Sequence, residues 1–311
     1  MQRRIMGDSG LSVSEIGLGT MNWGLEVDED TARSQLQCFL TSGGTLVDTA
    51  ASFADGRSEA ILGSLIGDVV ARQDLVLVSQ GGLRRGRSDP RMDSSRRGLL
   101  DSLDASMSRL GTDHLDLWLA PAPDEHVPVG EVLSALETAY TSGRVRYVGL
   151  ANHAGWQLAR AAALSAVPMT AHQCEYSLLN RRAEQEVVPA SEAMRIGLMA
   201  WAPLGRGALT GKYRGRVPAD SRAASDRWAP YVEPYLEGRP ARVTDAVATA
   251  AQGLKISCAE TAIRWLLHRP GVATAVVGAR NAEQLAAILA SDTSQLPEQI
   301  TAVLDEISEA D

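Results

Sequence analysis

Polar side chains that could bind a ligand or exchange a proton stand at the ends of several short apolar segments. Asp48, Gln80, Asn152 and Gln173 each close or directly follow such a segment. The three amides can hold a polar ligand by hydrogen bonds, whereas the carboxyl group can also gain or lose a proton. We therefore ask which elements bring these side chains together.

Apolar segments of strand length alternate with longer segments of helical period, and no Pro/Ser-rich linker divides them. Each short segment is almost continuously apolar, as expected for parallel strands buried on both faces. The expected strands are Glu15–Gly19, Thr45–Asp48, Leu75–Gln80, Leu115–Ala120, Val145–Ala151, Thr170–Glu175, Gly197–Ala202 and Thr274–Gly278. The expected helices include Asp30–Thr41, Ser58–Ile66, Val129–Ser142, Gly155–Ser165, Glu184–Arg195 and Ala259–Leu267.

Eight parallel strands joined by right-handed crossovers close into a barrel. We therefore predict an α/β protein of the (β/α)8 TIM-barrel type, with residues 1–311 forming a single domain that carries an N-terminal β-hairpin. The competing fold is the doubly wound Rossmann sheet, which would show G-x-G-x-x-G after its first strand. Gly17-Leu-Gly19 is followed by Asn22 instead of a third glycine, so the barrel is favoured. Its chemistry should occur at the C-terminal ends of the strands.

The composition excludes several kinds of partner. A net charge of −8 argues against nucleic acid and anionic membranes. We expect the Arg-dense segment 83–97 to be a solvated loop that runs into a helix, with Asp93, Ser94 or Ser95 capping that helix. No apolar run approaches the roughly 20 residues of a membrane span, and the N-terminus lacks the apolar region of a signal peptide. The simplest expectation is a cytoplasmic protein with reduced cysteines. Its oligomeric state is not predicted.

Longer motifs follow one another in the order of a known family. They are Ile16–Gly24, Val47–Phe53, Gly56–Glu59, Arg109–Asp113, Leu115–Leu117, Gly143–Gly149, Glu175–Arg181, Ala202–Tyr213 and Val277–Leu285. Together they resemble the aldo/keto reductase superfamily over nearly the whole chain. The resemblance is to its NADP-dependent branch, which includes potassium-channel beta-subunit-like and bacterial members.

This resemblance implies a reductase that binds NADPH across the barrel mouth and passes a hydride to a carbonyl group, with Asp, Tyr, Lys and His around the carbonyl oxygen. The Asp position is Asp48. The Tyr, Lys and His positions are occupied by Phe53, Gln80 and Pro121. The catalytic tetrad is therefore degenerate.

The three substitutions remove the means of proton transfer. Phe53 has no proton to give, Gln80 carries no charge to lower the pKa of a neighbour, and Pro121 has no polar side chain. Loss of a general acid costs about 10²–10⁴ in rate, so we expect ordinary carbonyl reduction to be weak or absent. We expect Gln80 to pair with Asp48 by a hydrogen bond. Without a cationic partner, Asp48 is expected to be protonated.

Histidines are the remaining candidates for a replacement acid. His153 follows Asn152 at the mouth and is favoured among the five. His172 precedes Gln173, so strand alternation should turn it away from the cofactor. None of the histidines stands at metal-ligand spacing from another ligand residue, so no metal is expected.

The cofactor positions are better preserved, which predicts NADP(H) binding. By resemblance, they are Asn152 and Gln173 for the carboxamide, Trp201 for the nicotinamide ring, Leu204, Gly205, Arg206 and Gly207 for the pyrophosphate, and Gly278, Arg280 and Gln284 for the adenosine end. Arg280 could meet a 2′-phosphate, which favours NADP over NAD. Ala151 and Ile288 replace a Ser and an Asn of the family, so a weakened affinity is expected. Taken singly, Gln173, Trp201 and Arg280 also have purely structural interpretations.

Aromatic residues suggest the character of the second ligand. Trp23, Phe53, Trp118 and Trp228 could line a substrate pocket for an apolar or ring-bearing small molecule, although a core role is favoured for Trp118. The loop Arg214–Ala241 should determine substrate identity, but its sequence predicts no ligand shape.

Three function classes remain open at this point. The first is an atypical NADPH-dependent reduction of an activated alkene or imine. The second is a catalytically silent NADP(H)-binding sensor or partner subunit. The third is a non-redox lyase, dehydratase or isomerase that uses the barrel mouth. The preserved carboxamide positions favour the first two classes.

Overall fold

The computed structural model describes residues 1–85, 90–219 and 221–309, with backbone only for 83–85 and 90–92. Its central strands are β3 (Ile16–Gly19), β4 (Leu46–Asp48), β5 (Val76–Gln80), β8 (Leu115–Ala120), β9 (Val145–Ala151), β10 (Met169–Glu175), β11 (Gly197–Trp201) and β12 (Val272–Val277). They are parallel and close into a barrel in the order β10-β11-β12-β3-β4-β5-β8-β9. The eight expected strands and the TIM barrel are confirmed, and the strand ends differ from expectation by two residues or fewer.

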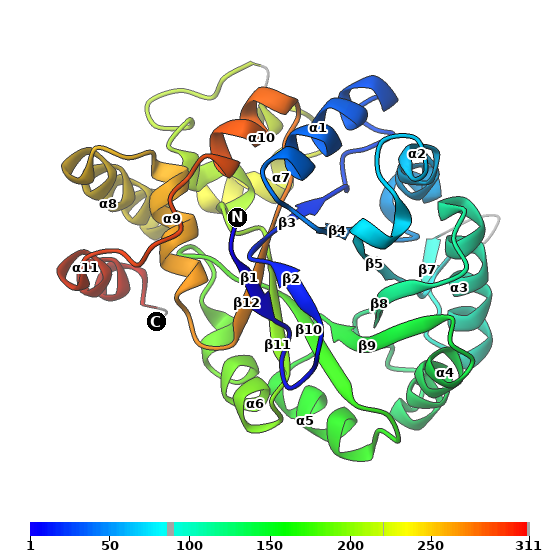
Figure 1. Ribbon diagram of the computed structural model, residues 1–311. Coiled ribbons are helices and arrows are strands. Elements are labelled where there is room, and N and C mark those ends of the chain that lie inside the picture. Colours follow the sequence, from blue (N-terminus) through cyan, green and yellow to red (C-terminus); the bar gives the residue numbers. More distant parts are fainter. Residues whose placement is uncertain (86–89, 220, 310–311) are drawn as a thin grey trace.

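Helices surround the barrel (Figure 1). They are α1 (Glu29–Thr41), α2 (Arg57–Leu65), α3 (Arg96–Leu110), α4 (Val129–Thr141), α5 (Gly155–Leu164), α6 (Val187–Ala193), α7 (Ala229–Val232), α8 (Gly238–Leu254), α9 (Cys258–Leu267), α10 (Ala282–Leu289) and α11 (Glu298–Ser308). Ser95 caps α3, since its side chain accepts a hydrogen bond from the backbone of Gly98. Within the described ranges, no helix is long and apolar enough to cross a membrane.

Two short hairpins complete the fold. β1 (Arg3–Ile5) pairs with β2 (Ser12–Ser14), which confirms the N-terminal hairpin. It lies across one end of the barrel in Figure 1. The hairpin and the residues beside it contribute Met6, Leu11 and Val13 to an inner apolar cluster. The other members of the cluster come from seven barrel strands and include Leu46, Val78, Leu117, Leu119 and Met199. The second hairpin joins β6 (Leu83–Arg85) to β7 (Pro90–Met92). The loop expected over residues 83–97 is thus corrected in part, since it includes two short strands and runs into α3 at Arg96. Residues 86–89 lie outside the described residues.

Two of the family-like motifs, Gly56–Glu59 and Arg109–Asp113, are joined by a buried ion pair. Glu59 on α2 is completely buried and accepts hydrogen bonds from Ser79 Oγ of β5 and Arg109 Nε of α3, each at 2.7 Å. The buried carboxylate is thus compensated by a cation and a hydroxyl group. These motifs therefore fix α2 and α3 against the barrel and do not point to a second site.

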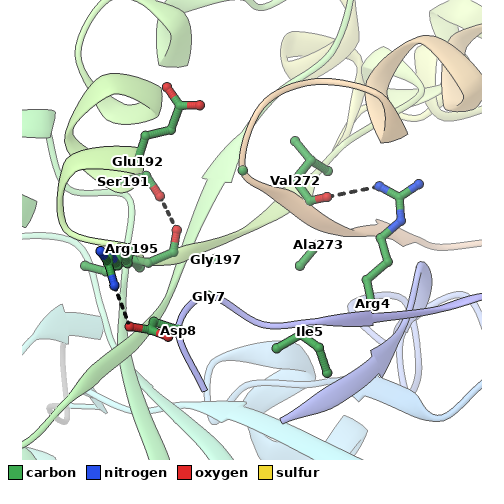
Figure 2. Close-up of a pocket in the computed structure, with 12 residues that line it drawn as sticks. Arg4, Ile5, Gly7, Asp8, Ser191, Glu192, Arg195, Gly197, Val272 and Ala273 are labelled. Carbon is green, nitrogen blue, oxygen red and sulfur yellow. Dashed lines mark hydrogen bonds and ion pairs between the residues drawn. The ribbon is translucent and has the colours of Figure 1, made fainter. Parts of the chain in front are cut away.

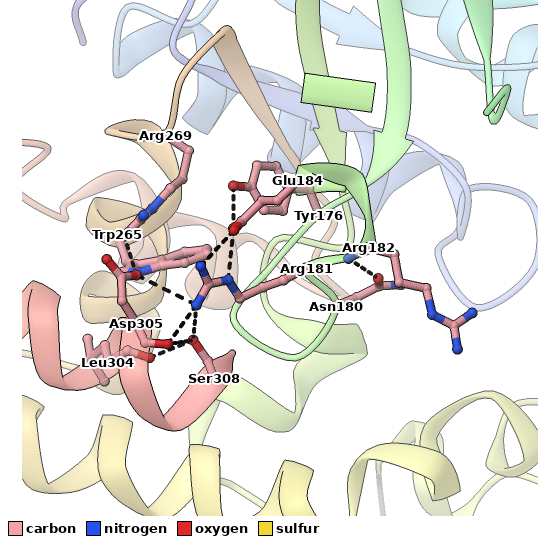
Figure 3. Close-up of polar contacts among 10 residues, drawn as sticks. All are labelled: Tyr176, Asn180, Arg181, Arg182, Glu184, Trp265, Arg269, Leu304, Asp305 and Ser308. Atoms are coloured by element: carbon pink, nitrogen blue, oxygen red, sulfur yellow. Dashed lines mark hydrogen bonds and ion pairs between the residues drawn. The ribbon is translucent and has the colours of Figure 1, made fainter. Parts of the chain in front are cut away.

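A second motif anchors the C-terminal helix. Arg181, which follows β10, binds both carboxylate oxygens of Glu184 at 2.6 and 2.8 Å. Arg181 Nη1 also donates to the carbonyl oxygen of Asp305 on α11 at 2.7 Å. The Asp305 carboxylate accepts from Trp265 Nε1 at 2.7 Å and from Arg269 Nη2 at 2.5 Å. Figure 3 shows how these contacts join α9, α11 and the segment after β10.

We expect Asp305→Ala to lower the free energy of unfolding by about 2–3 kcal/mol. The substitution removes the acceptor for the Trp265 indole and one acceptor for the Arg269 guanidinium, which are costly to leave unpaired. Urea unfolding followed by circular dichroism would measure the change. Glu306→Ala, on an exposed position of the same helix, is the matched control. Equal losses for the two variants would contradict the anchoring role of Asp305.

Candidate functional site

Unusual backbone conformations mark the C-terminal end of the barrel. Seven described non-glycine residues have a positive φ, and five of them follow β4, β9 or β11: Ala54, Asp55, Asn152, Ala202 and Arg206. A positive φ at a non-glycine residue costs about 1–3 kcal/mol of folding free energy, and it persists only where the surrounding structure holds the backbone in place. Such residues often cluster at functional sites. The active sites of TIM barrels lie at this same end. We call it the mouth and take it as the candidate site.

A hydrogen bond across the barrel forms the floor of the mouth. Gln173 Nε2 on β10 donates to Asp48 Oδ1 on β4 at 2.8 Å. The two strands stand four places apart in the ring of eight, and therefore face each other. Both side chains are 6% exposed, and the inner apolar cluster lies beneath them.

The expected pairing of Asp48 with Gln80 is wrong. Gln80 ends the neighbouring strand β5 and is only half-buried. Among the described residues its side chain makes no hydrogen bond, whereas Gln173 reaches Asp48 from the opposite wall. Adjacent strand ends suggested Gln80 from the sequence, but the barrel interior is narrow enough for a side chain on the far strand to make the contact.

Burial raises the pKa of Asp48 to about 7, and the hydrogen bond from Gln173 offsets part of that effect. No charged side chain contributes to the shift. The carboxyl group is therefore neutral over most of the range below pH 7, which agrees with the expected protonation of Asp48. A cation at position 80 would favour the opposite state.

The remaining tetrad positions bring no proton donor to the mouth. Asp48, Gln80 and Pro121 follow three strands that are neighbours in the ring. Phe53 is half-buried and opens the left-handed turn after β4. Pro121 is buried against Gly82, where a β-carbon would lie 2.4 Å from Pro121 Cγ. The geometry thus gathers the tetrad positions but provides neither a hydroxyl nor an ammonium group.

The two histidines beside the mouth bond to each other and to backbone. The backbone N–H of His153 donates to His172 Nε2 at 3.1 Å, and His153 Nδ1 donates to the carbonyl oxygen of Ala151 at 2.9 Å. Burial lowers the pKa of both rings, and that of His172 to about 3. Both are therefore neutral near pH 7. No hydrogen bond between described residues joins His153 to Asp48, so the favoured replacement acid gains no support.

The predicted nicotinamide residues lie together on neighbouring strand ends. Asn152 is exposed at the end of β9, and its Oδ1 accepts from Trp201 Nε1 on β11 at 2.8 Å. Arg206 lies 5.8 Å from the centre of the Trp201 ring and donates to Glu175 Oε2 at 3.0 Å. Tyr235, from the long loop, donates to Glu175 Oε1 at 2.8 Å. These contacts fix the loop after β11 at the mouth.

A pocket of about 390 Å³ lies where the predicted adenosine end should be. Its lining comes from the segments after β3, β11 and β12, namely Glu26, Ala219, Ser221, Arg222, Ala224, Ser225 and Arg280. Burial lowers the pKa of Arg222, whereas the nearby Glu26 acts to raise it. Gln284 Oε1 accepts from the backbone N–H of Arg280 at 3.2 Å and braces this segment. Two arginines and the Ser225 hydroxyl group form a donor set suited to a phosphate, whereas the Ser221 hydroxyl already donates to the carbonyl oxygen of Pro218 at 2.6 Å.

Some of these residues were missed by the sequence reasoning. Arg222 and the two serines belong to the long loop, which has no hydrophobic period and no motif to single them out. Lys212 was also missed, although it lies within the family-like motif Ala202–Tyr213. Its Nζ lies 4.9 Å from the centre of the Tyr213 ring and close to Gly207, in the predicted pyrophosphate loop. Its position after a glycine-rich turn was the available clue.

Two of the four predicted pocket aromatics are core residues. Trp23 is 1% exposed, and its Nε1 donates to Gln35 at 2.8 Å. Trp118 is completely buried in the cluster between strands and helices. Trp23 is therefore corrected to a core position, and the core role favoured for Trp118 is confirmed. Phe53 and Trp228 are half-buried, and Trp228 packs 5.8 Å from Tyr231.

A second pocket, of about 450 Å³, lies at the opposite end of the barrel (Figure 2). It is lined by the first hairpin and by the N-terminal ends of β11 and β12. Its arginines already have partners: Arg195 pairs with Asp8 at 3.4 Å, and Arg4 donates to the carbonyl oxygen of Val272 at 3.1 Å. This pocket lies at the end of the barrel opposite the strand ends that carry the predicted site residues, so it is not our candidate site. In the described part of the chain, no cluster of His, Cys, Asp or Glu could bind a metal.

Comparison with known proteins agrees with this geometry. The aldo/keto reductase family model matches residues 15–309. An uncharacterised oxidoreductase, YrpG, from Bacillus subtilis is 31% identical over 328 aligned residues, covering 99% of this chain and 96% of its own. Probable voltage-gated potassium channel beta subunits from rice and Arabidopsis thaliana are 31% and 30% identical, each covering 92% of this chain and 89% of their own. The chain therefore belongs to the aldo/keto reductase family.

Proposed function

We propose that the protein is an NADP(H)-dependent oxidoreductase that reduces an activated alkene or imine and is a poor reductase of ordinary carbonyl groups. The observation that carries the proposal is the Arg222–Arg280 pocket at one end of a mouth in which positions 53, 80 and 121 no longer provide the tyrosine, lysine and histidine of the family. An acceptor with its own electron-withdrawing group needs less help from an acid than a carbonyl oxygen does.

The residues present fit the cofactor. Arg222 and Arg280 would hold its 2′-phosphate, Lys212 and the Gly205–Gly207 turn would hold the pyrophosphate, and Asn152 with Trp201 would orient the nicotinamide. When bound, the reduced nicotinamide supplies the hydride. Phe53 then contributes an apolar wall beside the acceptor and no proton.

We expect Arg222→Ala and Arg280→Ala each to weaken NADPH binding by about 10–100-fold and to change NADH binding little. Each substitution removes a charge-assisted hydrogen bond that only the 2′-phosphate can receive. Fluorescence titration with both cofactors would measure the effect. Arg227→Ala, an exposed position in the same loop, is the control. Equal losses for NADPH and NADH would contradict the assignment of the pocket.

The proposed reaction can be tested with two hydride acceptors. We expect NADPH oxidation in the presence of 1-nitrocyclohexene and little or none with 4-nitrobenzaldehyde. Absence of NADPH binding would overturn the proposal. Rapid reduction of the aldehyde would contradict the part of it that concerns carbonyl groups.

A second candidate function is NADP(H) binding without turnover, in a subunit that associates with another protein. It is favoured by α5, which exposes Trp156 (60%) and Leu164 (58%). Large exposed apolar side chains are typical of surfaces that meet a partner. Two relatives are named as channel beta subunits. Tight NADPH binding with no reduction of either acceptor would favour this candidate.

A further inference from the structure

Asp48 places a carboxyl group with a free oxygen at the floor of the mouth. Its Oδ1 accepts from Gln173, and no described residue forms a hydrogen bond with Oδ2. The inner apolar cluster lies below, so the mouth is the open side available to Oδ2. A carboxyl group that already accepts one hydrogen bond from an amide, and is not ionised, has an O–H group left to donate.

The neighbours of Asp48 bring no charge to it. On one side β3 pairs Gly19 with Asp48, and Thr20 donates to the Asp48 carbonyl oxygen through its N–H and its hydroxyl group at 3.0 and 3.1 Å. On the other side β5 pairs Val78 with it. From the opposite wall comes the neutral amide of Gln173. Glu59, the nearest buried carboxylate along the chain, is paired with Arg109. An apolar, charge-free environment of this kind favours the neutral carboxylic acid.

We infer that Asp48 is the proton donor of this enzyme, in the place of the tyrosine that position 53 no longer provides. The inference rests on the proposed function. It assigns to Asp48 a role different from the one that the family resemblance implies, in which the aspartate pairs with a lysine. The replacement of that lysine by Gln80 frees the carboxyl group for the new role.

The reaction balances as follows for 2-cyclohexen-1-one. With reduced nicotinamide bound, a hydride would add to C3, the C=C electron pair would move to form the C1=C2 bond as the C=O pair moves to oxygen, and the O–H bond of Asp48 would break as its proton joins that oxygen. The resulting enol would tautomerise in water to the ketone. The products are cyclohexanone, oxidised cofactor and the Asp48 carboxylate. Water returns a proton to Asp48, so each turnover consumes one NADPH and one solvent proton.

Infrared difference spectroscopy tests the protonation state without turnover. Wild-type protein with NADPH bound should show a protonated carboxyl C=O band at pH 6 that disappears by about pH 8, since the pKa of Asp48 is raised to about 7. Asp48→Asn should lack this band, and Asp74→Asn, an exposed position before β5, should keep it. Absence of the band from wild-type protein at pH 6 would overturn the inference.

Kinetics with two acceptors test the donor role itself. The nitro group of 1-nitrocyclohexene accepts the electron pair without prior protonation, whereas the enone needs a proton as charge develops on its oxygen. Asp48→Asn should therefore reduce the enone rate at pH 6 by about 10²-fold or more, and should reduce the nitroalkene rate at least about tenfold less. The wild-type enone rate should fall above about pH 7, as the acid form is lost.

The outcomes separate this inference from the proposed function. A wild-type protein that binds NADPH but reduces neither acceptor contradicts the proposed function, and this inference with it. A wild-type protein that reduces the nitroalkene but not the enone contradicts the inference alone. The inference alone is also contradicted if the Asp48→Asn variant loses both activities equally. It is likewise contradicted if that variant retains the wild-type enone rate and pH profile.

Discussion

Replacing Phe53 by Tyr and Gln80 by Lys together should raise NADPH-dependent reduction of 4-nitrobenzaldehyde by about 10²–10⁴-fold. The tyrosine restores a hydroxyl group beside the acceptor. The lysine ammonium, next to Asp48, lowers the pKa of that hydroxyl and returns Asp48 to its ionised form. The strand ends that carry positions 48 and 80 are neighbours, so the family arrangement can be rebuilt without moving the backbone.

Steady-state assays with matched variants would isolate the effect of the charge. Phe53→Tyr with Gln80→Met supplies the hydroxyl group and a side chain of similar volume, but no cation. We expect this variant to remain at least about tenfold less active than the variant with lysine. A Tyr/Lys variant that binds NADPH and gains no activity would show that the mouth does not hold an acceptor in position for hydride transfer. Binding without turnover would then be favoured.

Asp48→Asn should stabilise the fold at pH 8 by up to about 4 kcal/mol. The pKa of Asp48 is about 7 in the folded protein and near 3.8 in the unfolded chain, a difference of about 3, and each unit corresponds to about 1.4 kcal/mol. Between these two values the folded protein holds more protons than the unfolded chain. Wild-type stability therefore falls as the pH rises from about 4 to about 7, and changes little above that range on account of this group.

Urea unfolding at pH 5 and pH 8 would measure this linkage. The stabilisation by Asp48→Asn should be about 2 kcal/mol at pH 5, where the carboxyl group is neutral in the folded protein but already ionised in the unfolded chain, and close to its maximum of about 4 kcal/mol at pH 8. Asp74→Asn controls for the removal of one negative charge from the chain. A stabilisation that is the same at both pH values would contradict the raised pKa of Asp48.

The fold was largely predictable because its strands are buried on both faces. Mostly apolar segments such as Leu115–Ala120 and Val145–Ala151 match the strands of the structure at both ends. The helix expected at Glu184–Arg195 begins later, at Val187, because residues 182–184 form a 3-10 turn beside the Arg181–Glu184 pair. Such a turn depends on tertiary contacts that hydrophobic periodicity does not record.

The site was predictable only in part, for reasons of geometry. Strand ends placed Asp48, Asn152 and Gln173 at the mouth, because the C-terminal ends of parallel strands share one face. They did not reveal that Gln173 crosses the barrel to Asp48. Arg222 was missed because only the folded loop brings it to Arg280. Trp23 was wrongly predicted to line the substrate pocket. Its indole N–H donates to Gln35 on α1, and this contact holds the ring in the core.

Titration of the purified protein with NADPH, with NADH for comparison, tests the central claim most directly. Quenching of tryptophan fluorescence reports binding, and Trp201 and Trp228 are near the predicted cofactor site. We expect saturable NADPH binding with a Kd in the micromolar range and an affinity for NADH at least about tenfold lower, since NADH lacks the phosphate that Arg222 and Arg280 would hold. If tryptophan fluorescence shows no saturable change up to about 1 mM NADPH, the prediction that the mouth binds this cofactor is contradicted.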